Sequence, residues 1–176
     1  MLPQQTWEIT AGSYVASLNI GMSISSLACS PILPMAVCGT ANGFLYILDF
    51  AKFDKPRIIL RERMHKGPVN GISFDQTGSV FATCSTDGHV FVFSGFASHS
   101  FKVLGYAIVP NGAMNDVSAY YNADTDKIRV AAPILDYATS GKNDGDTSGA
   151  SSGRKNGATD NSAVTQAARR VIAFLK

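Results

Sequence analysis

Residues 69–95 read VNGISFDQTGSVFATCSTDGHVFVFSG, and residues 24–50 read ISSLACSPILPMAVCGTANGFLYILDF. The two stretches align at an offset of 45 residues, which places the Asn-Gly pair at 42–43 opposite the Asp-Gly pair at 87–88. Such pairs suit tight two-residue turns that need positive φ. Apolar residues recur with period two on both sides of each pair, as in half-buried strands. Each stretch therefore predicts strands joined by tight turns.

Less complete copies of the same unit flank these two stretches. A weaker copy follows Asp116 as VSAYYNADTDKIRVAA, and a partial copy leads the chain, where Trp7-Glu8 precedes Leu48-Asp49 by 41 residues. A repeat of 41–45 residues with four short strands has the length and content of one blade of a β-propeller.

The strand pattern extends over residues 1–137 with no helix-length periodic segment between the strands. An all-β architecture is therefore expected, in the form of a partial propeller of about three blades. The expected strands are residues 14–20, 24–30, 35–38, 43–48, 57–61, 69–74, 80–85, 89–93, 101–106, 117–121 and 128–132.

The unit at 69–95 resembles the repeat of the WD40 family. His65 precedes the first strand, Thr83 lies on the second, Asp87 lies in the turn, and Phe93 stands where the family has tryptophan. The resemblance implies a buried hydrogen-bond network of His65, Thr83 and Asp87, which is shortened because Phe93 has no indole donor. In the earlier unit the matching positions hold Cys38, Asn42 and Leu48.

Residues 23–132 also resemble the cilia- and flagella-associated WD-repeat proteins, with the phrase SHSFKVLGY at 98–106 as a distinguishing feature. This resemblance implies a protein–protein interaction scaffold in the cytoskeleton of the cilium or flagellum axoneme. The implied partners are inner-arm dynein and doublet microtubules, and the implied role is in flagellar motility. The alternative is a generic WD40 adaptor in a soluble cytoplasmic complex.

The rest of the chain differs in composition. Of the 24 residues at 139–162, 19 are Gly, Ser, Thr, Asn or Asp, which predicts a flexible linker at 138–162. Residues 163–176 carry apolar side chains near a 3.6-residue period, which predicts a short amphipathic helix. Because a propeller closes with typically four to eight blades, the blade count indicates a piece of a longer protein, with completion by further copies of the chain as the other interpretation.

Overall composition excludes several classes. The 176 residues are 45% hydrophobic and carry a formal net charge of +2, too little to indicate a nucleic-acid partner. Neither a membrane-spanning run nor a secretory signal is expected from the sequence. Cys29, Cys38 and Cys84 form no C-x-x-C pair, so reduced, buried thiols and a cytoplasmic location are expected.

No catalytic, cofactor or metal site is predicted. His65, Ser85 and Asp87 are residue types of a hydrolase triad, but the G-x-S-x-G elbow is absent, and structural hydrogen bonds explain them better. The three histidines and three cysteines lack metal-ligand spacing. Residues 122–127 (NADTDK) resemble a calcium loop but lack its glycine and final glutamate, which favours a turn between strands.

One segment carries concentrated charge. Residues 52–66 hold six basic and two acidic side chains, and Arg57, Arg61 and Arg63 alternate along a predicted outer strand. Charges on an outer strand prevent unwanted edge pairing. The functional hypothesis is that this strand contacts an acidic partner protein.

Overall fold

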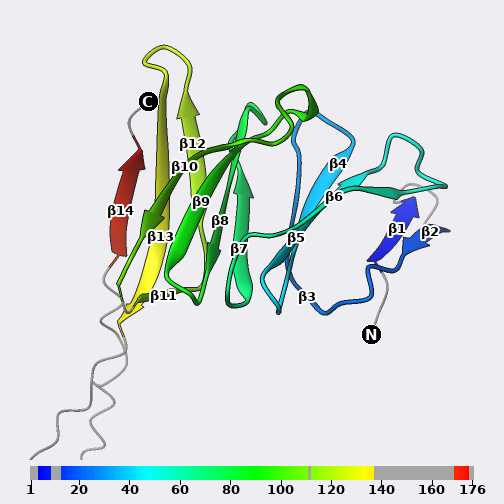
Figure 1. The fold of residues 1–176 in the computed structure, drawn as a ribbon. Coiled ribbons are helices and arrows are strands. Elements are labelled where there is room, and N and C mark those ends of the chain that lie inside the picture. Colours follow the sequence, from blue (N-terminus) through cyan, green and yellow to red (C-terminus); the bar gives the residue numbers. More distant parts are fainter. Residues whose placement is uncertain (1–3, 9–12, 111, 137–168, 175–176) are drawn as a thin grey trace, which may run out of the picture.

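The computed structural model describes residues 4–8, 13–110, 112–136 and 169–174. In this part of the chain, antiparallel sheets stand side by side along the sequence (Figure 1). One short 3-10 helix, η1 (Ala97–His99), is the only helical element among the described residues. The prediction of an all-β partial propeller is confirmed.

The first blade is a four-stranded sheet in which each strand pairs with the next along the chain. Its strands are β3 (Ile24–Cys29), β4 (Met35–Thr40), β5 (Phe44–Asp49) and β6 (Arg57–Arg63). The second blade repeats this arrangement with β7 (Val69–Phe74), β8 (Val80–Ser85), β9 (His89–Ser94) and β10 (Val103–Ile108).

The two blades share their irregularities as well as their order. In the first blade the pairing skips Ser25 on β3 and Ile59 on β6. In the second it skips Asn70 on β7 and Leu104 on β10, each 45 residues further on. A β-bulge bends and twists its strand, so both blades are bent at the same two points.

The third sheet contains β11 (Gly112–Met114), β12 (Ser118–Asn122), β13 (Lys127–Asp136) and β14 (Arg169–Phe174). β11 and β12 pair with successive parts of β13. Strand β14 also pairs with β13 and lies on the side away from β12 (Figure 1). At the other end of the molecule, β1 (Gln4–Glu8) and β2 (Ser13–Leu18) form a leading hairpin.

The C-terminal prediction needs correction. A helix was expected over 163–176, but residues 169–174 form strand β14; the remainder of that range lies outside the described residues. A lone short helix is marginal in water, whereas β13 offers a row of backbone hydrogen-bonding groups with which β14 pairs. The predicted linker at 138–162 also lies outside the described residues.

Strand boundaries agree within a few residues, with three differences. The sequence did not indicate β1 or β11 as strands. Strand β10 begins at Val103 rather than Phe101, because η1 and two residues of positive φ, Ser100 and Phe101, precede it.

The core lies between adjacent sheets, because both faces of the central blade strands are covered. On β4, Val37 packs toward the second blade while Cys38 packs toward the segment just after the leading hairpin. On β8, Phe81 faces the first blade and Ala82 faces the third sheet. This explains why β4 and β8 are buried along their whole length.

Candidate functional site

The predicted network residues lie together in the second blade. His65, in the segment between β6 and β7, places Nε2 2.9 Å from the Thr83 hydroxyl and Nδ1 3.4 Å from Oδ1 of Asp87. The other Asp87 oxygen accepts the backbone N–H of Lys66 at 2.7 Å, and Oδ1 accepts that of His89 at 2.9 Å. One carboxylate thereby fastens the segment entering the blade to the β8–β9 turn.

Electrostatics fix the protonation of this network. Burial lowers the pKa of His65, and the nearby Asp87 carboxylate only partly offsets that effect. Burial alone would raise the pKa of Asp87, but the backbone N–H groups of Lys66 and His89, together with His65, bring it below its usual value. Asp87 is therefore ionised, which assigns the His65 proton to Nδ1 and makes Nε2 the acceptor for the Thr83 hydroxyl.

Two phenylalanines, Phe91 and Phe93, provide the aromatic packing beside the network. Phe93 is buried and stacks on Phe81 with ring centroids 4.8 Å apart. Phe91, which pairs with Thr83 across the sheet, meets the His65 ring edge-on at 5.0 Å. Sequence reasoning missed Phe91, although its alternation with Phe93 on one strand was a usable signal.

The first blade has different residues at the positions of this network, and the Thr40 hydroxyl accepts the backbone N–H of Phe44 at 3.0 Å across its β4–β5 turn. Cys38 occupies the position of Thr83 and is buried, and burial raises its thiol pKa to about 12. Burial likewise raises the pKa of Cys84 to about 12. Both thiols are therefore protonated and unreactive. Cys29 is exposed, contrary to the expectation that all three cysteines are buried.

The three arginines of the predicted interaction strand lie on β6 and are exposed, but they do not share a face. Arg61 pairs with Tyr46 and stacks over Phe44 at 4.9 Å, and Arg63 lies over the same ring at 6.0 Å. Arg57 pairs with Asp49, which is on the opposite side of β5 from Tyr46. The bulge at Ile59 shifts the alternation by one residue, so the expected single stripe of arginines is divided between two faces.

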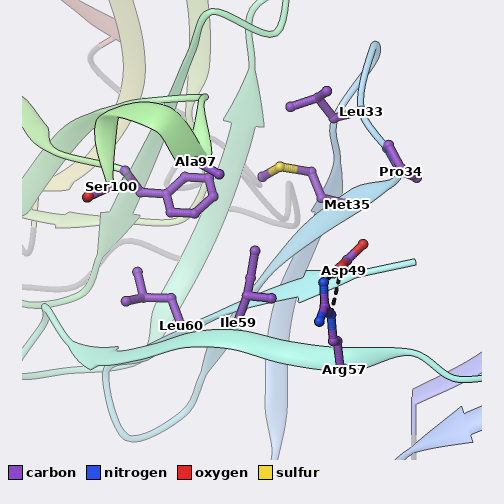
Figure 2. Close-up of a pocket in the computed structure, with 10 residues that line it drawn as sticks. Leu33, Pro34, Met35, Asp49, Arg57, Ile59, Leu60, Ala97 and Ser100 are labelled. Atoms are coloured by element: carbon purple, nitrogen blue, oxygen red, sulfur yellow. Dashed lines mark hydrogen bonds and ion pairs between the residues drawn. The ribbon is translucent and has the colours of Figure 1, made fainter. Parts of the chain in front are cut away.

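A groove of about 550 Å³ lies between the first and second blades (Figure 2). Its lining comes from the β3–β4 turn, the end of β5, strand β6, and the segment around η1 in the second blade. At one end of the groove, the Arg57 guanidinium binds Asp49 at 2.7 Å. The apolar lining residues include Leu33, Met35, Ile59, Leu60 and Phe101.

Comparison with known proteins identifies the family. A family model described as "Vps42 beta-propeller" matches residues 23–125. This chain belongs to that β-propeller family. The propeller fold is also that of the Cps50 (Swd1) β-propeller domain of Myceliophteria thermophila, with a TM-score of 0.54 at 11% identity over 65% of this chain and 33% of that one.

Two curated relatives of this propeller chain are named for cilia and flagella. The chain is 35% identical over 130 residues to cilia- and flagella-associated protein 43 of Xenopus laevis, covering 74% of this chain and 8% of that protein. It is 26% identical over 117 residues to the Mus musculus protein of the same name, covering 66% and 7%. The chain thus spans less than a tenth of the length of these relatives.

The propeller fold is typical of interaction scaffolds, and the candidate triad fits a structural role. His65 is 1% exposed and its Nε2 contacts Thr83. Ser85 accepts the Asp87 backbone N–H at 3.2 Å, which places its hydroxyl in the turn. The His65 ring therefore lies inside the blade, where a substrate has no access to it.

The described part of the propeller has neither a cluster of metal-ligating side chains nor a membrane-spanning helix. No group of three or more His, Cys, Asp or Glu side chains there is arranged to hold a metal ion. No helix in that part is long and apolar enough to span a bilayer. Residues 122–127 form the turn between β12 and β13, in which the Tyr121 hydroxyl donates to Asp126 at 2.9 Å.

Proposed function

We propose that this chain is a non-catalytic interaction module of a ciliary or flagellar scaffold that tethers inner-arm dynein to doublet microtubules. One observation carries the proposal: the 35% identity over 130 residues to a relative named as cilia- and flagella-associated. The blades supply rigid edges and loops, which suit protein–protein contact better than chemistry.

Strand β6 is the proposed contact with an acidic partner. It is the outer strand of its sheet, so its free backbone edge faces away from β5. Arg61 and Arg63 present two guanidinium groups on one face of this strand, supported by the Phe44 ring. Such a cationic edge suits the acidic surface of a microtubule or of a dynein-associated subunit.

Fractionation tests the location. Ciliated cells are separated into axonemes and soluble extract, and both are probed with an antibody raised against residues 66–93. Recovery of the polypeptide in axonemes supports the proposal. Recovery in the soluble extract alone contradicts it and favours the alternative, an adaptor in a soluble multiprotein complex, with which the match to the propeller family model is equally compatible.

Charge reversal tests the contact. We expect the double substitution Arg61→Glu and Arg63→Glu in the full polypeptide to reduce its co-purification with inner-arm dynein and doublets. The matched control reverses Lys102 and Lys127, which are exposed and lie in the second blade and the third sheet rather than in the sheet of β6, and it changes the net charge by the same amount. Equal losses in the two variants would mean that net charge, rather than this strand, drives association.

A further inference from the structure

The groove beside β6, hereafter the first groove, has a counterpart one blade further along. A second groove, of about 210 Å³, lies between the second blade and the third sheet. Four of its lining residues lie 45 positions after lining residues of the first groove. Ser79 corresponds to Pro34, Val80 to Met35, Ser94 to Asp49, and Leu104 to Ile59. Ile59 and Leu104 are also the bulged residues of their strands.

The two grooves differ in size and charge. In the second groove, Ser94 bonds the His99 ring nitrogen at 3.1 Å, and no arginine or lysine is among its lining residues. In the first groove, Asp49 and Arg57 take the place of Ser94 and His99. The larger groove therefore has an arginine–aspartate ion pair at one end, and the smaller groove does not.

The charge available at the first groove is positive. Arg57 uses Nε and one terminal nitrogen to bind a single oxygen of Asp49, at 2.8 and 2.7 Å. Its side chain is 73% exposed, so the remaining N–H groups are open to a second anion. Lys52 and Lys55, in the loop that leads to Arg57, add two exposed cations against one exposed anion, Asp54.

The walls of the first groove are apolar and partly open. Ile59 is 40% exposed, and Leu60, Met35 and Leu33 continue the apolar lining toward the second blade. Figure 2 shows Met35, Ile59 and Leu60 on the groove side of their strands and Leu33 on the turn before β4, with the Asp49–Arg57 pair at one end. An aliphatic side chain placed here would be removed from water beside cations that attract carboxylates.

We propose that the first groove binds an extended acidic segment of a partner protein, with one bulky aliphatic side chain in the hollow and carboxylates against Arg57. The proposal rests on the proposed function only in taking the partner to be a protein. Residues 139–162 of this chain do not fit, because they contain no aliphatic or aromatic side chain larger than alanine. The charge at the mouth selects an acidic segment over a basic one.

Peptide binding to the full 176-residue chain tests this. The probe is a fluorescent peptide of aspartate and glutamate with two central leucines, measured by anisotropy; the comparison peptides replace the leucines with alanine or the acidic residues with lysine. We expect saturable binding of the first peptide only, weakened by added salt. Ile59→Glu and Arg57→Glu should each weaken it at least about tenfold.

The matched control is Leu104→Glu. Leu104 is 39% exposed and stands at the equivalent position of the second groove. Its substitution therefore also replaces a half-exposed aliphatic side chain with glutamate, but outside the proposed binding groove. We expect binding within about twofold of the unmodified chain. The melting temperatures of all variants show whether they are folded. The alanine-containing peptide tests the contribution of the leucine side chains without altering the protein.

Several outcomes would overturn the proposal: no saturable binding, equal binding of the alanine peptide, or equal loss in Leu104→Glu. Light scattering that shows a dimer broken by Ile59→Glu would instead assign the groove to a second copy of this chain. The peptide assay does not depend on where the polypeptide lies in the cell. Recovery of the polypeptide in soluble extract alone would therefore contradict the proposed function without contradicting peptide binding at the first groove.

Discussion

At the scale of single residues, His65 is a buried histidine kept neutral by its surroundings. The ionised Asp87 carboxylate satisfies Nδ1, the Thr83 hydroxyl satisfies Nε2, and the Phe91 ring covers one side. Protonation would place a positive charge on a residue that is only 1% exposed, and burial therefore lowers the pKa of His65. The network is therefore a source of pH-dependent stability.

We expect the free energy of unfolding to fall as the pH is lowered from about 7.5 to about 5.5. Burial lowers the folded-state pKa of His65, so below about 6.5 the unfolded chain binds a proton that the folded chain resists. The contribution is complete above the unfolded pKa and is lost as the pH falls toward the folded one. Urea midpoints at the two pH values provide the measurement.

Two variants test whether His65 causes this pH dependence of stability. His65→Gln should flatten the dependence of the midpoint on pH. His89→Gln, which alters a partly exposed histidine beside the same carboxylate, should retain it. An unchanged slope in His65→Gln would show that the titration belongs elsewhere.

At the scale of elements, each blade is joined to the next segment of the chain by the same contacts. The turn glycine of the first blade, Gly43, accepts the backbone N–H of Met64 at 3.1 Å. Its counterpart Gly88 accepts that of Val109 at 2.8 Å. On the inner strands, the bulged residues Ser25 and Asn70 bond the backbone carbonyls of Val69 and Met114, again 45 residues apart.

We expect Gly88→Ala to destabilise the chain by more than about 1 kcal/mol. Gly88 has φ +80°, and an added Cβ would approach the Val109 carbonyl to 2.5 Å. The control is Gly21→Ala, since Gly21 has φ +70° with nothing within 4 Å of the added Cβ. Denaturant unfolding distinguishes the cost of placing alanine at positive φ from the cost of the clash with the Val109 carbonyl. Similar losses of unfolding free energy in both variants would mean that the backbone conformation alone causes the destabilisation.

We expect deletion of residues 169–176 to increase amide hydrogen exchange along β13. Strand β14 pairs with β13 from Ile128 to Pro133, and its loss would leave that edge open to water. Strands β4 and β8 serve as internal references because sheet neighbours flank them on both sides. Unchanged exchange in β13 would contradict the pairing.

Local signals account for what the sequence could predict. Turn glycines and period-two alternation located the blade strands, and the resemblance to the WD40 repeat implied the contact between His65 and Asp87. The bulges at Ile59 and Leu104 have no comparable signal, so the division of the β6 arginines between two faces was not foreseen. The short apolar run in β14 fits a helix or a strand, and the open edge of β13 decides between them. The first groove escaped prediction because its lining comes from segments far apart in sequence.

At the scale of the whole molecule, the blades cover the faces of one another's central strands and leave the outer strands β6 and β10 largely exposed. Tyr106 and Ile108 follow the bulge of β10, lie on one face of that strand and are both exposed. The third sheet covers the inner strands of the second blade through residues of β11, β12 and β13. An apolar face is thus left at the outer part of the second blade.

We expect this face to bind an apolar fluorescent dye such as ANS in the folded state. The double substitution Tyr106→Lys and Ile108→Lys should reduce the dye signal severalfold with little change in melting temperature, because both side chains are exposed. Replacing the exposed Ile32 and Phe53 of the first-blade loops provides the comparison. Dye binding that depends on those residues instead would place the apolar surface in the loops.

Because the contacts at Gly43 and Gly88 repeat after 45 residues, one blade of that length can be gained or lost as a whole. A gene that gained or lost that length between matching points of two blades would still present each turn carbonyl to the correct amide and each bulged side chain to the correct strand. Blade number can thus change by recombination without new contacts, whereas an insertion of any other length must be accommodated within a loop.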